Sequence, residues 1–201
     1  MIARYPDDIT MREARRRYFE ANAFGPNGGY DDPWVDFKLG PLPFPFLNTP
    51  ARVRAVRYHD LHHLLTGYAT DIVGEFEISA WEIGAGCKSF AAAWVLNLGG
   101  IAAGLVRAPR RTFAAFVRGR RHRTVYGEDD LEALLDRTVG DVRARFTPDD
   151  VDLRTRAGDV ALFTLAAVAG IVVGLLTFAL VVPLVPFGLL AHRLRRNAQA
   201  A

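Results

Sequence analysis

Residues 57–77 read RYHDLHHLLTGYATDIVGEFE and place two apolar, helix-forming segments on either side of a glycine. The pair Thr49–Pro50 is a favourable start for the first helix, because threonine caps free amide groups and proline has no amide hydrogen to satisfy. We expect this helix to cover about 50–65 and to stop at Gly67, since glycine readily adopts the left-handed conformation that ends helices. A second helix is expected over about 71–81.

The first of these helices carries metal-ligand residue types at helical spacing. His59 and His63 stand one turn apart and share a face, and Asp60 lies beside them. Two imidazoles at i and i+4 together with a carboxylate can close on one cation. His62 points to the opposite side and is not expected to be a co-ligand.

Glu75 supplies a further carboxylate on the second helix. On one straight helix it would lie ~18 Å from His63, too far to share an ion. The break at Gly67 allows the chain to turn back and bring Glu75 to the two histidines. The residues therefore predict a metal site of His59, Asp60, His63 and Glu75. This donor set suits Zn²⁺, and it also suits Fe²⁺ or Mn²⁺.

The spacing H-D-x2-H-x11-E at these positions resembles the signature of the coenzyme Q biosynthesis protein 4 family. The surrounding sequence YHDLHHLLTGYATDIVGE is similar to the family at positions other than the ligands. The later segment DLEALLDRTVGDVRARF loosely resembles the last helix of the family. The resemblance is clear over about residues 50–106 and weaker to residue 147. The hydrophobic tail and the proline-rich arm of this chain depart from the family's pattern.

The resemblance implies an all-α fold, a zinc site and a role in ubiquinone biosynthesis at a membrane. It ties the protein to the step that removes the ring carboxyl at C1 of a prenylated aromatic acid and installs a hydroxyl there, or to organisation of the biosynthetic complex. The implied partners are the prenylated quinone precursor or another lipid and other proteins of quinone biosynthesis. A homodimer is left open.

Two other functions compete with this one. A metal-dependent hydrolase would use Asp60 as its catalytic base, because HDxxH resembles the zinc-protease motif HExxH with a shorter acid. A non-catalytic, lipid-binding scaffold would hold a purely structural metal in a closed, four-ligand site. If Asp60 instead orients a histidine, the site stays open and catalysis is favoured.

The rest of the chain predicts further helices and no sustained strand, so the expected fold class is all-α. Helices are expected over 10–24, 89–106, 109–119 and 128–146. Residues 25–50 are rich in proline and glycine and are expected to form an ordered, extended arm. The expected organisation is an N-terminal helix and arm over 1–48, a helical metal-binding domain over 49–150 and a membrane segment over 160–191.

The segment 160–191 contains no charged residue over its 32 positions. As one helix it would be ~48 Å long, more than the ~30 Å of a bilayer's hydrocarbon core, and Pro183 and Pro186 offer a break. We expect a span over about 160–182 and a short return or exit after it. From the basic residues and the lack of an apolar N-terminal leader in MIARYPDDIT we expect the metal domain on the cytoplasmic side, which is the inner membrane if the source is bacterial.

The composition of the chain limits the classes of binding partner that we expect. A net charge of +3 does not mark a nucleic-acid binder, and no recognised nucleic-acid motif is present, so nucleic acid is not an expected partner. The single cysteine, Cys87, excludes an internal disulfide and reads as a small buried residue. The Ala/Gly-rich helix at 89–106 either lines a groove for a lipid tail or packs closely on its neighbours. A cluster of arginines at 107–123 around Phe113, Phe116 and Val117 favours either an interfacial helix or a solvated face.

Overall fold

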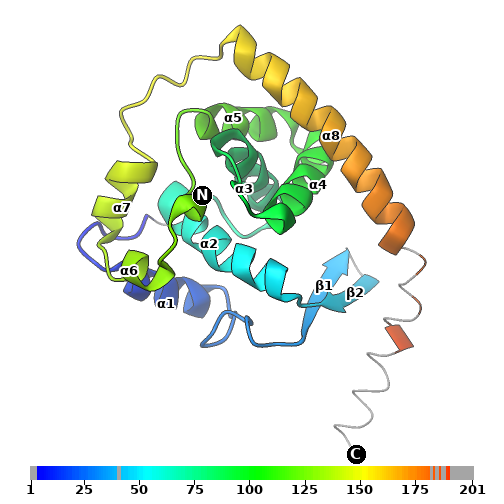
Figure 1. Cartoon of the computed structure of the whole chain (residues 1–201), viewed down its shortest axis with the longest axis horizontal. Coiled ribbons are helices and arrows are strands. Elements are labelled where there is room, and N and C mark those ends of the chain that lie inside the picture. Colours follow the sequence, from blue (N-terminus) through cyan, green and yellow to red (C-terminus); the bar gives the residue numbers. More distant parts are fainter. Residues whose placement is uncertain (1–3, 40–41, 182, 184–185, 187–188, 191–201) are drawn as a thin grey trace, which may run out of the picture.

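Eight α-helices and one β-hairpin make up the part of the chain that the computed structural model describes, which is residues 4–39, 42–181, 183, 186 and 189–190. In chain order the elements are α1 (Met11–Ala21), β1 (Trp34–Leu39), β2 (Leu42–Leu47), α2 (Pro50–Thr66), α3 (Ile72–Ala85), α4 (Ala91–Arg107), α5 (Pro109–Gly119), the 3₁₀ turn η1 (Val125–Gly127), α6 (Leu131–Leu135), α7 (Val139–Phe146) and α8 (Ala157–Val181). The predicted all-α fold class is confirmed (Figure 1).

The hairpin is a regular element within the arm that the sequence predicted as extended only. Strands β1 and β2 are antiparallel, and Pro43 and Pro45 of β2 stand opposite Lys38 and Asp36. A two-stranded hairpin consists only of edge strands, so proline is tolerated there although it removes a ladder donor. This is why a proline-rich segment without an alternating pattern still forms strands.

The helix–break–helix unit at the metal motif forms as predicted. The Thr49 hydroxyl accepts a hydrogen bond from the amide of Arg52, and Gly67 ends α2 in the left-handed conformation at φ 74°. Asp71 caps α3 by accepting from the amide of Gly74 at 2.7 Å. Helix α3 runs four residues past the expected end at Trp81 and closes at Ala85. That extra turn carries a residue that proves central to the site, Glu82.

The single helix predicted over 128–146 is wrong. The segment divides into α6 and α7, because Asp130 and Thr138 each start a new helix by capping the amide three residues ahead. Between α6 and α7 the carbonyl of Arg137 accepts from the amide of Met11, and Thr10 bridges to Thr138. Helix α1 is held against α6 and α7 in this way.

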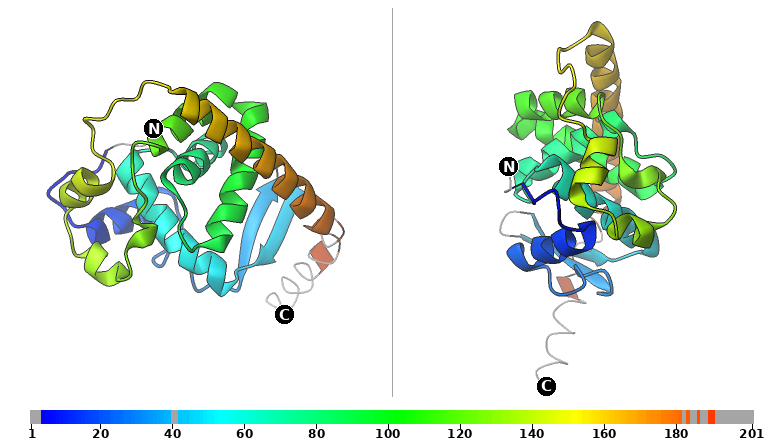
Figure 2. Two further views of the ribbon diagram at one scale, coloured as in Figure 1. Left: turned by 45° about the horizontal axis from the view of Figure 1, so that its top comes forward. Right: turned by 90° about the vertical axis from the view of Figure 1, so that its left-hand side faces the viewer.

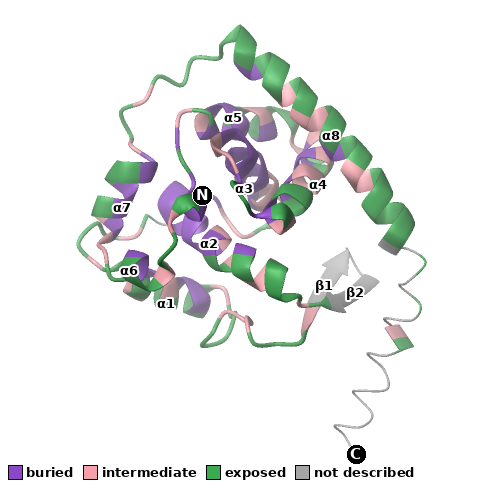
Figure 3. Cartoon of the chain, in the orientation of Figure 1, coloured by how far each residue is buried: buried purple, intermediate pink, exposed green. Residues whose placement is uncertain are grey.

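The core lies where α3 packs between α4 and α5, around the buried side chains Trp81 and Ile101 (Figure 3). On α4 a Cβ atom at Gly100 would lie 2.3 Å from Oγ of Ser79, and one at Gly104 would lie 2.5 Å from Oγ1 of Thr112. Glycine is therefore required for close helix packing at both positions, which favours the second of the two predicted alternatives for this helix at Gly100 and Gly104. Cys87 is buried, as predicted.

Helix α8 lies along α4 on one side of the domain (Figure 1, Figure 2). The ring of Phe163 packs on the rings of Phe113 and Phe116 of α5, with centroids 5.0 and 5.3 Å apart. The apolar residues of α5 therefore face the protein, not lipid. Among the described residues α8 is the one helix long and apolar enough to cross a membrane. Most of the predicted continuation to residue 191 lies outside the described residues.

Candidate metal centre

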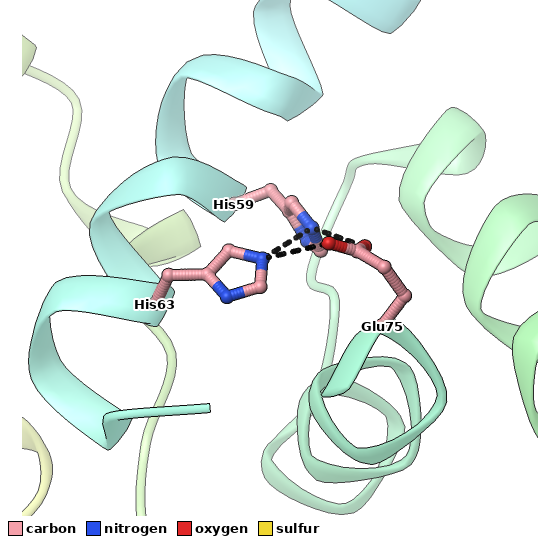
Figure 4. Close-up of side chains that lie close together, drawn as sticks. All are labelled: His59, His63 and Glu75. Carbon is pink, nitrogen blue, oxygen red and sulfur yellow. Dashed lines mark hydrogen bonds and ion pairs between the residues drawn. The ribbon is translucent and has the colours of Figure 1, made fainter. Parts of the chain in front are cut away.

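Three of the four predicted ligands meet at one point. His59 and His63 come from consecutive turns of α2, and Glu75 comes from the first turn of α3, which the break at Gly67 folds back against α2 (Figure 4). The Nε2 atoms of the two histidines are 3.2 Å apart. Each lies 3.4 Å from an oxygen of Glu75. One ligand atom from each residue thus lies within 4.8 Å of the others.

These separations fit a bound metal ion. A tetrahedral ion with nitrogen and oxygen ligands at roughly 2.0–2.1 Å has ligand–ligand edges of roughly 3.3–3.4 Å. The two Nε2 atoms are 3.2 Å apart and each lies 3.4 Å from a different oxygen of Glu75, so these separations are close to such edges and the three side chains surround one point. Two neutral imidazoles and one carboxylate are also a donor set that Zn²⁺, Fe²⁺ and Mn²⁺ accept.

The second ring nitrogen of each histidine is held by the protein. Nδ1 of His59 lies 2.8 Å from Oε1 of Glu82, and Nδ1 of His63 lies 2.9 Å from the carbonyl oxygen of Tyr68. Because both acceptors require a proton on Nδ1, both Nε2 atoms are left free to bind a cation. Metal-binding histidines in proteins are oriented by partners of this kind. The ring of Tyr18 stacks on His63 and adds a steric constraint on its rotation.

Glu82 is a fully buried carboxylate that accepts four hydrogen bonds. Its donors are Nδ1 of His59, Nδ1 of His62, Nδ2 of Asn97 and the hydroxyl of Tyr126. Burial raises the pKa of a carboxyl group, but the two histidines outweigh burial here and hold the pKa of Glu82 well below its usual range. Glu82 is therefore a permanent anion beneath His59.

The pKa values of His59 and Glu75 follow the same balance. Burial opposes the charged form of His59, yet Glu82 and Glu75 raise its pKa well above the ordinary value. Burial likewise opposes ionisation of Glu75, but hydrogen bonds from His59 and His63 lower its pKa to about 2. Glu75 and Glu82 stay ionised through the neutral pH range, so a divalent cation that displaces the Nε2 proton of His59 meets two carboxylates.

Asp60 is not brought into this cluster. Its carboxylate accepts from the hydroxyl of Tyr30 at 2.5 Å and lies 3.5 Å from the hydroxyl of Tyr18. Tyr30 belongs to the arm and Tyr18 to α1, so Asp60 ties both segments to α2. Burial raises the pKa of Asp60, against the lowering effect of His59. The structure thus places Asp60 as a link between three segments, and its predicted roles as ligand and base stay predictions.

One side of the cluster is open. The side chain of His63 is 1% exposed and that of His59 18%, whereas that of Glu75 is 43% exposed. A cation held by the three residues would be reached from the Glu75 side. On that side water or a substrate oxygen would be able to complete the coordination of such a cation, as in catalytic zinc sites, which keep one position open.

The sequence did not assign the residues that orient the histidines. Glu82 stands seven positions after Glu75, two turns along the same face of α3, and this spacing is the one signal that could have found it. The Tyr68 carbonyl has no sequence signal, because it depends on the path of the loop. His62 is outside the ligand cluster, as expected, and its Nε2 accepts from the amide of Val125.

Comparisons of the chain with protein-family models, with curated proteins and with solved structures give no match. The geometry of the His59, His63 and Glu75 cluster therefore carries the functional argument.

Proposed function

We propose that this protein is a membrane-associated metalloprotein that binds one divalent ion through His59, His63 and Glu75. The observation that carries the proposal is the close approach of the ligand atoms, with the two Nε2 atoms 3.2 Å apart and each 3.4 Å from an oxygen of Glu75, together with the fixed Nδ1 atoms of both histidines. Ligand atoms at tetrahedral separations with oriented imidazoles are what a metal site requires before the ion arrives.

The pathway we propose is ubiquinone biosynthesis, and this part rests on the resemblance of the H-D-x2-H-x11-E motif. The protein would act on, or present, a prenylated aromatic acid at the C1 step. The ring carboxylate is a hard oxygen donor of the kind that divalent ions accept at an open position. The exposed side of Glu75 supports access of such a group.

The chemistry of that step constrains the metal. Replacing a ring carboxyl by hydroxyl releases CO₂, forms a carbon–oxygen bond and removes two electrons, so an oxidant such as dioxygen is needed. Zn²⁺ has no redox chemistry and would only bind and polarise the acid. Fe²⁺ or Mn²⁺ would suit the oxidation itself. The chain's own residues hold the ion in place and keep one side of it accessible.

The site favours this reading over the two alternatives. A structural metal in a scaffold is usually closed by four protein ligands, whereas the described residues offer three here. A hydrolase built on HDxxH needs Asp60 near the ion as a base, yet its carboxylate is engaged by Tyr30. The apolar helix α8 supports membrane association, and the basic residues around its start support a cytoplasmic location of the metal domain.

Metal analysis of the purified protein tests the site. We expect about one divalent ion per chain, lost in the double variant His59→Ala, His63→Ala and strongly reduced in Glu75→Gln. Glu77→Gln is the matched control, because Glu77 lies on the same helix but pairs with Arg111 at 2.6 Å instead of joining the cluster. Full metal content in the double histidine variant would refute the site.

A deletion strain of a ubiquinone-producing source organism tests the pathway. We expect lower quinone content and accumulation of a prenylated ring acid, both restored by the wild type and by Glu77→Gln but not by Glu75→Gln. Normal quinone content in a strain that has no second copy of the gene would reject the pathway, while the metal assignment would stand on its own measurement.

A further inference from the structure

Helix α8 is apolar on all sides, yet only a narrow stripe of it contacts the domain. The covered positions are Asp159, Phe163, Ala166, Ala167, Gly170, Val173 and Gly174, and the other residues between 157 and 180 are exposed (Figure 3). Only 11% of the residues in its most apolar window are buried. A helix that is hydrophobic all round needs apolar surroundings, and the domain provides them along one edge only.

The contact along that edge is close. A Cβ atom at Gly170 would lie 2.4 Å from the carbonyl oxygen of Leu98 on α4, so the two helix backbones touch. Small residues at Gly170 and Gly174 form the four-residue spacing that lets apolar helices approach within a bilayer. At the start of α8 the buried Asp159 pairs with Arg121 at 2.5 Å. Helix α8 is thus fixed to α4 and α5 and is not a free tail.

Helix α4 has an apolar outer face of its own next to this contact. Trp94 is 37% exposed, Val95 48% and Val106 87%, and Leu96 is exposed as well. Because the backbones of α4 and α8 touch at Leu98 and Gly170, lipid that surrounds α8 must also reach this face of α4. The exposed sides of the two helices form one continuous apolar surface.

We propose that α4 and α8 insert together, as one two-helix layer whose exposed side chains contact the acyl chains of a phospholipid bilayer. The inference rests on the membrane association proposed above. It differs in that α8 and α4 together contact the membrane, instead of α8 alone. Lipid is the occupant we infer because α8 exposes apolar side chains from Val160 to Leu180, and such a surface suits the acyl chains of one leaflet while the rest of the domain stays outside the hydrocarbon core. The basic residues also lie where headgroups would be.

Those basic residues gather at one end of the layer. Phe163, near the start of α8, meets α5, and α5 follows the end of α4, so the start of α8 and the end of α4 lie together. Exposed arginines surround that end, namely Arg107, Arg110, Arg120, Arg154 and Arg156. Cations at the border of an apolar surface suit the anionic headgroups of a membrane.

The layer also lies close to the metal centre. The buried side of α4 carries Asn97, whose amide donates to Glu82, and Glu82 holds the ring of His59. By helical spacing the exposed side chains of Val95 and Val106 lie on the opposite side of α4 from Asn97. Helix α4 therefore has an outward apolar face, while its other side contacts the carboxylate that orients His59.

Tryptophan fluorescence tests the proposal on the full-length Trp34→Phe chain, in which only Trp81 and Trp94 emit, reconstituted into vesicles of phosphatidylcholine and phosphatidylglycerol. We expect brominated acyl chains to quench part of its emission, and we expect that part to be lost when Trp94→Phe is added. Trp81 is fully buried and serves as the internal reference that stays unquenched. Equal quenching with and without Trp94→Phe would overturn the proposal.

Vesicle flotation of two matched variants provides a second readout. Val95→Asp places a carboxylate on the proposed lipid face, and Ala144→Asp places one at an exposed position of α7. We expect Val95→Asp to weaken partitioning roughly tenfold or more, from the cost of an aspartate in the bilayer, and Ala144→Asp to float like the wild type. Circular dichroism confirms that both variants fold.

The failures are distinguishable. In one outcome the wild-type chain floats while Trp94 stays unquenched and Val95→Asp partitions normally. This result would show that α4 does not contact lipid, whether α4 faces water or is covered by a second copy of the chain, and it would overturn the paired layer. A chain that does not float at all overturns both the layer and the proposed membrane association. Metal content is measured separately and is affected by neither outcome.

Discussion

Nδ1 of His59 on α2 lies 2.8 Å from Oε1 of Glu82 on α3, and this contact determines which nitrogen of His59 is available to a metal. The same oxygen accepts from Nδ1 of His62 at 2.7 Å, while the other oxygen accepts from Asn97 and Tyr126. All four partners are donors. The geometry therefore requires an ionised carboxylate at position 82.

Glu82→Gln should weaken metal binding by ~10–100-fold, the range for residues that orient metal ligands. The amide keeps a similar shape but loses the charge, and its NH₂ group faces donors. Competition with a chelator measures the affinity, and Glu77→Gln controls for loss of a carboxylate on the same helix. Wild-type affinity in Glu82→Gln would show that His59 does not depend on this contact.

Asp60→Asn separates the two roles of Asp60. If Asp60 binds the ion or orients one of its ligands, the substitution should lower the metal affinity by ~10–100-fold. Because the carboxylate accepts from Tyr30 at 2.5 Å, we expect nearly unchanged affinity and a loss of stability instead. Tyr30→Phe should reproduce that loss, about 1 kcal/mol for one hydrogen bond, in thermal or urea unfolding. A strong drop in metal affinity would return Asp60 to the ligand set.

Alanine at two adjacent glycines of α4 should have opposite effects. A Cβ atom at Gly99 meets nothing within 4 Å, so Gly99→Ala should stabilise the helix by roughly 0.5–1 kcal/mol. At Gly100 the added Cβ would lie 2.3 Å from Oγ of Ser79, and overpacking of this kind costs about 1–3 kcal/mol. Unfolding in detergent measures both. Equal effects of the two substitutions would contradict the packing of α4 on α3.

His122 should make the protein less stable in mild acid. Burial and Arg118 lower its pKa from 6.5 to about 4, so the unfolded chain binds a proton that the folded chain does not. The free energy of unfolding is therefore unaffected by this titration above pH 6.5. It decreases as the pH falls from 6.5 toward about 4, by up to ~1.4 kcal/mol per pH unit.

His122→Gln tests this dependence, because glutamine can still accept the hydrogen bond that Nε1 of Trp81 donates at 3.0 Å. The free energy of unfolding of wild type and variant should converge as the pH is lowered from 7 to 5, because the wild type loses more. A difference that stays constant over this range would exclude His122 as the titrating group.

The local part of the site was readable from the sequence. His59 and His63 share a face because helical periodicity determines it, and Gly67 ends α2 because glycine adopts a left-handed conformation at little cost. The return of Glu75 followed from that break. The caps Thr49 and Asp71 and the apolar run that became α8 are local signals of the same kind. Each depends on residues within a few positions of one another.

Only the tertiary structure decided the contacts between segments far apart in the sequence. Asp60 is adjacent to His59, but its partner is Tyr30, 30 positions away. Glu82 orients His59 across 23 positions, and Gly170 meets Leu98 from another helix. Helical spacing says which way a side chain points along its own helix. It does not say which helix lies opposite, because that depends on how all the apolar faces pack at once.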